Sequence, residues 1–123
     1  MRTTILLLAI LTTACSPATV RRGLRYTANV TEWSAQASLA CDAGSTRAAV
    51  RGGDMEQNPI MGTHPDGSVI GAYFVGSAVG VAAYNRVLPD ILRVSINLIV
   101  IGGEFAAAAG NSQADPRVGM CGL

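Results

Sequence analysis

The chain has 123 residues, of which 50% are hydrophobic and only 14% are charged. This length allows one domain, and the low charge excludes a disordered chain. Nine basic residues, all of them arginine, stand against eight acidic ones, so the chain lacks the positive surplus that nucleic-acid binding requires.

Residues 1–14 have the pattern of an export signal, with one arginine, a short apolar run and then small residues. The run is too short to span a bilayer, which takes about 20 residues. The stretch from Leu11 to Cys15 resembles a bacterial lipobox, so we expect Cys15 to be lipidated and to become the new N-terminus. The alternative is an ordinary signal peptide, cut near Ala14 or Ala18, in which Cys15 has no role.

Residues 15–28 are expected to form a tether behind the signal. Export would place Cys41 and Cys121 in an oxidising compartment, where we expect a disulfide between them. The alternative is that both stay reduced as small, buried apolar residues. The cysteines and His64 are too scattered for a zinc site, which needs several ligands at close spacing.

The first helix is predicted from about Asn29 to Arg51, because this stretch is rich in alanine and contains no proline. It is expected to end at Gly52-Gly53, since glycine is typical of a helix C-terminus. Small residues and one tryptophan recur at helical spacing, and we expect this stripe to pack against another helix: Trp33, Ala37, Ala40, Gly44 and Ala48.

Two apolar helices, 68–88 and 91–110, follow a turn region at 54–66. Asp66 or Thr63 is expected to cap the first of them. Each is about long enough to cross a membrane, and the short connection between them predicts a transmembrane hairpin. Small residues at every fourth position would allow close helix packing in lipid, as at Ala72, Gly76 and Gly80, and again at Gly102, Ala106 and Gly110.

Glu104 lies inside the second apolar helix, where a lone carboxylate is costly. We expect this side chain to be neutral, paired or turned toward the bundle interior, where it would link two helices; a role in an ion or proton path is the remote alternative. Arg93 stands 11 positions earlier, about 16 Å along the helix, which is too far for a direct pair. Residues 112–123 are expected to be a flexible tail.

The turn region contains the sequence Glu56-Gln-Asn58-Pro-Ile-Met-Gly62. It resembles the Glu-x-Asn-Pro-(Leu/Ile)-(Leu/Met)-Gly turn of a group of small, uncharacterised bacterial and prophage-associated helical membrane proteins. The resemblance covers about residues 33–111 and implies a helix before the turn, two apolar helices after it and no known reaction. It also implies one polar structural cluster, in which the turn braces the first helix: Asp42, Thr46, Glu56 and Asn58.

These features together predict an all-α fold, a small three-helix bundle over residues 29–111 whose last two helices form a transmembrane hairpin. We expect no enzyme, no cofactor and no metal, because His64 has no acid–base partner at a recognisable spacing.

The sequence favours an exported bacterial membrane protein of the cell envelope, placed in the inner membrane, with a structural or interaction role. Its partners would be the membrane and either a second copy or another membrane protein, bound through the small-residue helix faces. Two alternatives stay open. One is a lipid-anchored soluble periplasmic helical domain, and the other is a membrane enzyme or carrier that uses Glu104.

Overall fold

The computed structural model describes residues 17–53, 58, 60–114, 119 and 121. These residues form three helices, α2 (Pro17–Gly52), α3 (Gly67–Val87) and α4 (Asp90–Ala114). The expected all-α three-helix bundle is confirmed for this part of the chain. The export signal, Cys15 and Glu56 lie outside the described residues.

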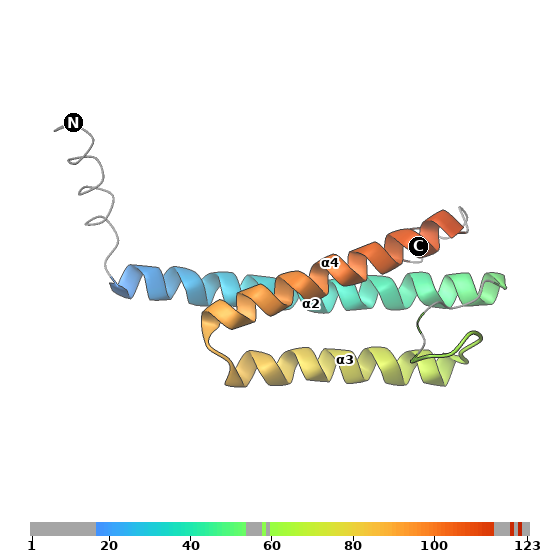
Figure 1. The fold of residues 1–123 in the computed structure, drawn as a ribbon, viewed down its shortest axis with the longest axis horizontal. Helices are drawn as coiled ribbons and strands as arrows, with labels where there is room; N and C mark the ends of the chain where they lie inside the picture. Colours follow the sequence, from blue (N-terminus) through green and yellow to red (C-terminus); the bar gives the residue numbers. More distant parts are fainter. Residues whose placement is uncertain (1–16, 54–57, 59, 115–118, 120, 122–123) are drawn as a thin grey trace, which may run out of the picture.

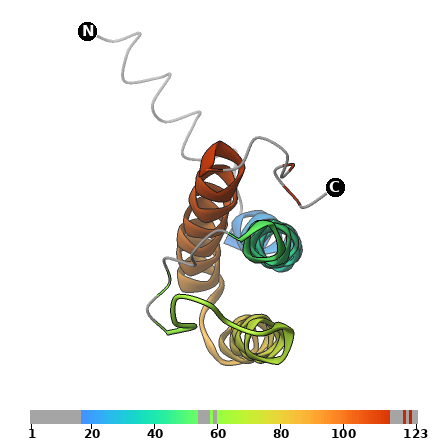
Figure 2. The same ribbon diagram turned by 90° about the vertical axis from the view of Figure 1, so that its right-hand side faces the viewer.

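Helices α2 and α4 run side by side in the same direction, and α3 runs antiparallel to both (Figures 1 and 2). The most extensive packing joins α2 to α4, the first helix to the last, whereas α3 packs mainly on α2. A small apolar core between α2 and α3 includes Leu39, Ile70 and Phe74. Most of the polar contacts between helices accordingly join α2 to α4.

Helix α2 begins at Pro17, so residues 17–28 are helical where a tether was expected. Proline fits the first turn of a helix, because its missing N–H has no intrahelical partner there. The leucine, alanine and arginines that follow favour helix. Helix α4 likewise continues to Ala114, past the expected start of the tail.

The ends of the helices follow the sequence signals. Gly53 follows α2 with a φ of 97°, and its N–H donates to the Val50 carbonyl at 3.1 Å, which is the geometry that favours glycine after a helix. Asp66 is the N-cap of α3, and its carboxylate accepts hydrogen bonds from the N–H groups of Ser68 at 2.8 Å and Val69 at 3.0 Å. These bonds, together with one from the Ser68 hydroxyl, lower the pKa of Asp66.

The buried face of α2 is not the expected stripe, because Trp33 is 77% exposed and Ala37 and Ala40 are exposed as well. A tryptophan in this contact would hold two helix backbones apart, whereas small residues let them approach. The buried positions recur at steps of three and four residues, the spacing of a coiled-coil contact. We call them the α2 seam: Ala28, Thr31, Ala35, Ser38, Asp42, Ser45 and Ala49.

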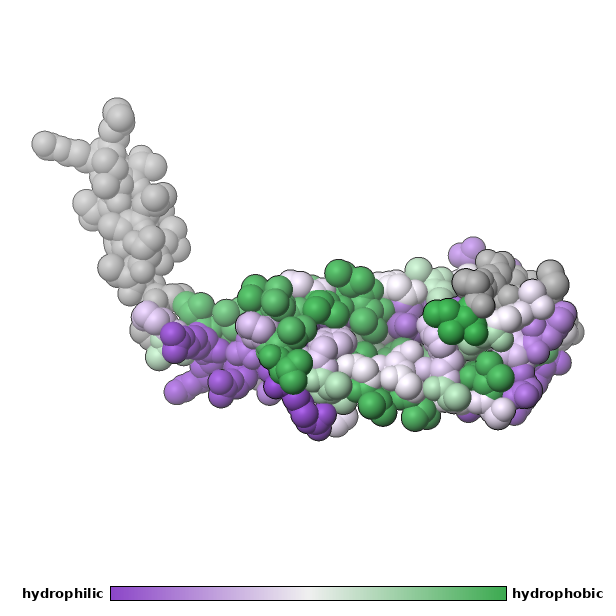
Figure 3. All heavy atoms as spheres, turned by 60° about the horizontal axis from the view of Figure 1, so that its bottom comes forward, coloured by the Kyte–Doolittle hydropathy of each residue, from purple (hydrophilic) through white to green (hydrophobic). Residues whose placement is uncertain are grey.

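Apolar side chains cover the outside of α3 and α4. Figure 3 shows hydrophobic atoms over the middle of the bundle, with hydrophilic atoms gathered at its two ends. The small-residue faces point outward too, since a Cβ added at Gly76, Gly80, Gly102 or Gly110 would meet nothing within 4 Å. The exposed large side chains include Val75, Val79, Val87, Ile91, Leu92, Leu98, Ile99 and Phe105.

Candidate functional site

A carboxyl cluster lies between α2 and α4, in the half of the bundle where α2 ends. Asp42 belongs to the α2 seam and is 6% exposed. The Asn111 amide of α4 donates to Thr46 Oγ1 and to Ser45 Oγ, both at 3.1 Å, with Asp42 Oδ1 at 3.4 Å. The Ser45 hydroxyl donates to the Asp42 backbone oxygen at 3.0 Å. Two of the four residues expected in one polar cluster, Asp42 and Thr46, are therefore brought together.

Glu104 completes the carboxyl cluster from α4. It is half-buried and hydrogen-bonds the Asp42 carboxyl on α2. Two carboxyl groups can share a hydrogen bond only with a proton between them, since an ionised carboxylate only accepts. A proton held by one of the two carboxyl groups would let the pair link the two helices without placing two negative charges side by side.

A second set of polar side chains, the asparagine network, joins all three helices. Its centre is Asn97 of α4, which is completely buried. The Asn97 amide donates to Thr31 Oγ1 of α2 at 3.2 Å and to Asn85 Oδ1 of α3 at 3.0 Å. Asn97 Oδ1 accepts from the Tyr84 hydroxyl at 2.6 Å and from the Asn85 amide at 3.0 Å. All four hydrogen-bonding capacities of this side chain are used.

Arg93 extends the asparagine network toward the start of α4. Its side chain is 12% exposed, so it lies within the bundle and does not reach outward. The guanidinium donates to Asp90 Oδ1 at 2.9 Å, Glu32 Oε2 at 3.2 Å, Asn29 Oδ1 at 3.0 Å and Asn85 Oδ1 at 3.1 Å. Charge-assisted bonds of this kind are stronger than neutral ones, and they fix the start of α4 against α2.

Three further predicted residues, Asn58, Cys41 and Cys121, are described in the structure. Asn58 Oδ1 accepts from the Ile60 N–H at 3.0 Å, a local bond within its own turn. Cys41 and Cys121 are joined by a disulfide with an S–S distance of 2.00 Å. This bond ties the chain beyond α4 to α2, in the half of the bundle that holds the carboxyl cluster.

The polar clusters join the helices to one another. Within the described residues, no group of three or more His, Cys, Asp or Glu side chains could hold a metal ion. His64 is exposed in the turn before α3. The buried polar atoms of the asparagine network bond one another, and such satisfied networks fix one helix arrangement.

Sequence reasoning missed Ser45, Tyr84 and Asn85 as members of these clusters. The signal that could have found Ser45 is the alternation of three and four residues along α2, which places it on the face of Asp42. Tyr84 and Asn85 lie on α3 and meet a residue of α4. Their role depends on the pairing of helices, which local spacing does not encode.

No protein-family model matches the chain, and no curated protein or solved structure matches it either. The resemblance to small prophage-associated membrane proteins therefore stays a prediction.

Proposed function

We propose that the chain is a membrane-integral three-helix bundle with a structural or interaction role in a bacterial cell envelope. The observation that carries this proposal is the apolar outer surface of α3 and α4. Valine, leucine and isoleucine face outward there, while the interior combines a small apolar core with buried asparagine, serine, threonine and aspartate side chains. In water this arrangement would expose the apolar surface that folding normally buries.

The two apolar helices behave as membrane spans and not as core helices. Both Gly67–Val87 and Asp90–Gln113 are long and apolar enough to cross a membrane. A core helix of a soluble protein passes the same test, but most of it is buried. Here only 17% and 11% of the two apolar windows are buried inside the bundle, which favours lipid as their surroundings.

The interior supports the same proposal. A polar side chain in a membrane is expected to face the bundle interior and to pair there. Asn97, Asn85 and Asp42 meet both conditions. The alternative, a lipid-anchored soluble domain, would need the apolar helices to bury one another, and α3 and α4 pack little against each other.

The outward small-residue faces support an interaction role. The ridge of Ala72, Gly76 and Gly80 on α3 and the ridge of Gly102, Ala106 and Gly110 on α4 are exposed or open in this chain. Such ridges let helix backbones approach closely in lipid. A second copy or another membrane protein would bind there.

Membrane fractionation with a carbonate wash tests the proposal, using the wild type and Cys15→Ala. We expect both proteins to stay in the membrane pellet, because α3 and α4 hold them there without a lipid anchor. Release of Cys15→Ala alone would instead establish the lipid-anchored soluble domain. Release of both would contradict any integral or lipid-anchored form.

A further inference from the structure

We propose that α2 is a third membrane-spanning helix, and that the end of the bundle where α2 begins lies in the cytoplasm. The inference rests on the proposed membrane location of α3 and α4, because α2 is not itself one of the two described helices that are apolar enough to cross a membrane. It goes beyond the hairpin expected from the sequence, in which α2 would lie outside the lipid. Because α2 packs along the length of α4 (Figure 1), lipid around α4 must also reach the outer face of α2.

The exposed charges of α2 stand one membrane thickness apart. Arg25 and Arg47 are separated by 22 positions, about 33 Å at the helical rise of about 1.5 Å per residue. Asp66 and Arg86, which flank α3, are separated by 20 positions, about 30 Å. Both distances match the hydrocarbon core of a bilayer, about 30 Å thick.

The two charged residues between these arginines of α2 are both engaged inside the bundle. Glu32 forms an ion pair with Arg93 at 3.2 Å, and its side chain is 29% exposed. Asp42 is 6% exposed and belongs to the carboxyl cluster. The outer face of α2 therefore presents no unpaired charge to lipid between Arg25 and Arg47.

The hydroxyl groups of α2 are hydrogen-bonded within the helix in the same stretch, although Thr27 and Ser34 are exposed. Thr27, Thr31, Ser34 and Ser38 each donate to a carbonyl three or four residues earlier in the helix, at 2.9–3.1 Å. The Gln36 amide donates to the Ala78 carbonyl of α3 at 3.0 Å. Polar groups in a spanning helix have to be satisfied internally in this way, since lipid offers no hydrogen bonds. A helix outside the membrane has no such requirement.

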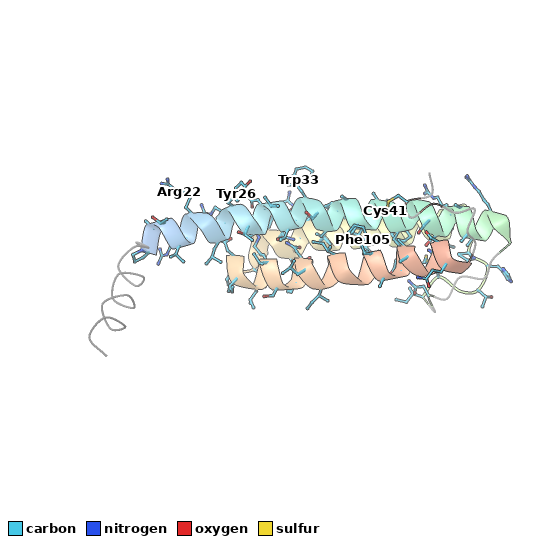
Figure 4. The ribbon with its side chains drawn as sticks, turned by 90° about the horizontal axis from the view of Figure 1, so that it is seen from above. Arg22, Tyr26, Trp33, Cys41 and Phe105 are labelled. Atoms are coloured by element: carbon cyan, nitrogen blue, oxygen red, sulfur yellow. A yellow bond between two sulfur atoms is a disulfide. The ribbon has the colours of Figure 1, made fainter. Side chains whose placement is uncertain are left out.

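A tyrosine on the outer face of α2 fits the membrane–water interface. In Figure 4, Arg22, Tyr26 and Trp33 point away from the other helices. Tyr26 is 72% exposed and Trp33 is 77% exposed. Tyrosine gathers where a spanning helix leaves the hydrocarbon, and Tyr26 directly follows Arg25. Trp33 lies eight positions further into the proposed span, about 12 Å from Arg25.

The distribution of arginine sets the orientation. Four exposed arginines lie at the end where α2 begins and α3 meets α4, which we call the arginine end: Arg21, Arg22, Arg25 and Arg86. At the opposite end the described residues include two exposed arginines, Arg47 and Arg51. Cytoplasmic segments next to spans carry the excess of arginine, so the arginine end belongs inside.

The disulfide favours the same orientation, with Cys41 six positions, about 9 Å, inside the Arg47 end of the proposed span. Cys41 lies in the half of α2 next to Arg47, and it bonds Cys121 beyond the end of α4. Disulfides persist on the oxidising side of a membrane and are rare in the cytoplasm. Cleavage of an export signal before Pro17 would leave the N-terminus of α2 on the outer side of the membrane and reverse this orientation. The inferred orientation and the expected cleavage are therefore alternatives.

Cysteine labelling in intact membranes tests whether α2 spans. The probe is a membrane-impermeant maleimide, and the variants Ala37→Cys on α2 and Val79→Cys on α3 are made in a Cys15→Ala background. Both positions are exposed in the bundle. We expect both to label about tenfold less than Thr63→Cys in the turn before α3, because a thiol in lipid forms little reactive thiolate.

The two variants separate the inference from the proposed function. Labelling of Ala37→Cys with protection of Val79→Cys would overturn the third span and leave the hairpin. Labelling of both would contradict the membrane location itself. A gel without reductant checks that each variant keeps the Cys41–Cys121 bond.

The side of the membrane from which each end of the bundle is labelled gives the orientation of the bundle. We expect Thr63→Cys to label in intact spheroplasts and Ala18→Cys, at the start of α2, to label only in inverted vesicles. Both residues are exposed in the structure. Labelling of Ala18→Cys from outside would overturn the orientation and support the exported start.

Discussion

Asn97 shows why buried polar side chains specify this bundle. Its amide bonds one residue from each of the other two helices, Thr31 and Asn85, while being fully buried. Apolar contacts in lipid tolerate many helix arrangements, because lipid tails are as apolar as leucine. An amide whose four hydrogen-bonding capacities are all used is compatible with only one arrangement of the three helices.

We predict that Asn97→Leu lowers the free energy of unfolding in detergent by about 3 kcal/mol, because it leaves the buried Asn85 and Tyr84 groups without their partner. Thermal unfolding followed by Trp33 fluorescence would measure the change. Ser95→Ala is the control, since the Ser95 hydroxyl is exposed and bonds only its own helix. Equal stability of the two variants would show that the network contributes nothing.

The partners of these residues could not be predicted from the sequence. Asn97 and Thr31 are 66 positions apart, and no local pattern relates them. Asp42 and Thr46 could be assigned to one cluster, because four positions place them on one helix face. Asn111 and Glu104 complete that cluster from α4, and their approach depends on the register of two helices that are far apart in the chain.

The three helices and most of their ends were predictable from the sequence, but the buried face of α2 was not. The Gly52-Gly53 end and the Asp66 cap follow local rules of helix termination. The position of Trp33 does not, because the spacing that placed it on one face with alanine and glycine does not say which face of α2 is buried. In α2 the small and hydroxyl-bearing residues of the α2 seam are inside, and the tryptophan is outside.

We predict that Asp66→Ala lowers the melting temperature of the bundle by a few degrees at pH 7, because the first N–H groups of α3 lose their acceptor. The pKa of Asp66 is lowered in the folded state, so the ionised cap stabilises α3 above the unfolded pKa of about 3.9. This contribution is lost as the pH falls through the folded pKa. The difference between wild type and Asp66→Ala should therefore shrink in acid.

Circular dichroism at pH 7 and at pH values below the folded pKa would measure this. The matched control is Asp66→Asn, which keeps a capping acceptor without a charge and should lose the pH dependence alone. A constant difference between wild type and Asp66→Ala at all pH values would contradict the prediction.

At the scale of the whole molecule, the ridges lie on the outer surface. A substitution there can therefore change self-association without changing the fold. Gly76 and Gly102 have open space where a side chain would be added. We predict that Gly76→Leu or Gly102→Leu weakens self-association about tenfold, since it holds the helix backbones apart, and leaves the monomer folded.

Sedimentation equilibrium in detergent would measure the association, and retention of the Cys41–Cys121 bond would report the fold. Val75→Leu adds volume to an exposed position of α3 that lies about 100° around the helix from Gly76 and serves as the control. A wild-type protein that stays monomeric at all concentrations would exclude a second copy as the partner.

The pairing of the first helix with the last has a consequence for biosynthesis. The α2 seam carries Asp42 and Thr31, whose partners on α4, Asn111 and Asn97, are made last. In the proposed membrane location, α2 would enter the bilayer before these partners exist. A nonsense mutation before Asp90 would therefore remove more than one helix, because it would also leave the α2 seam without its contacts to α4.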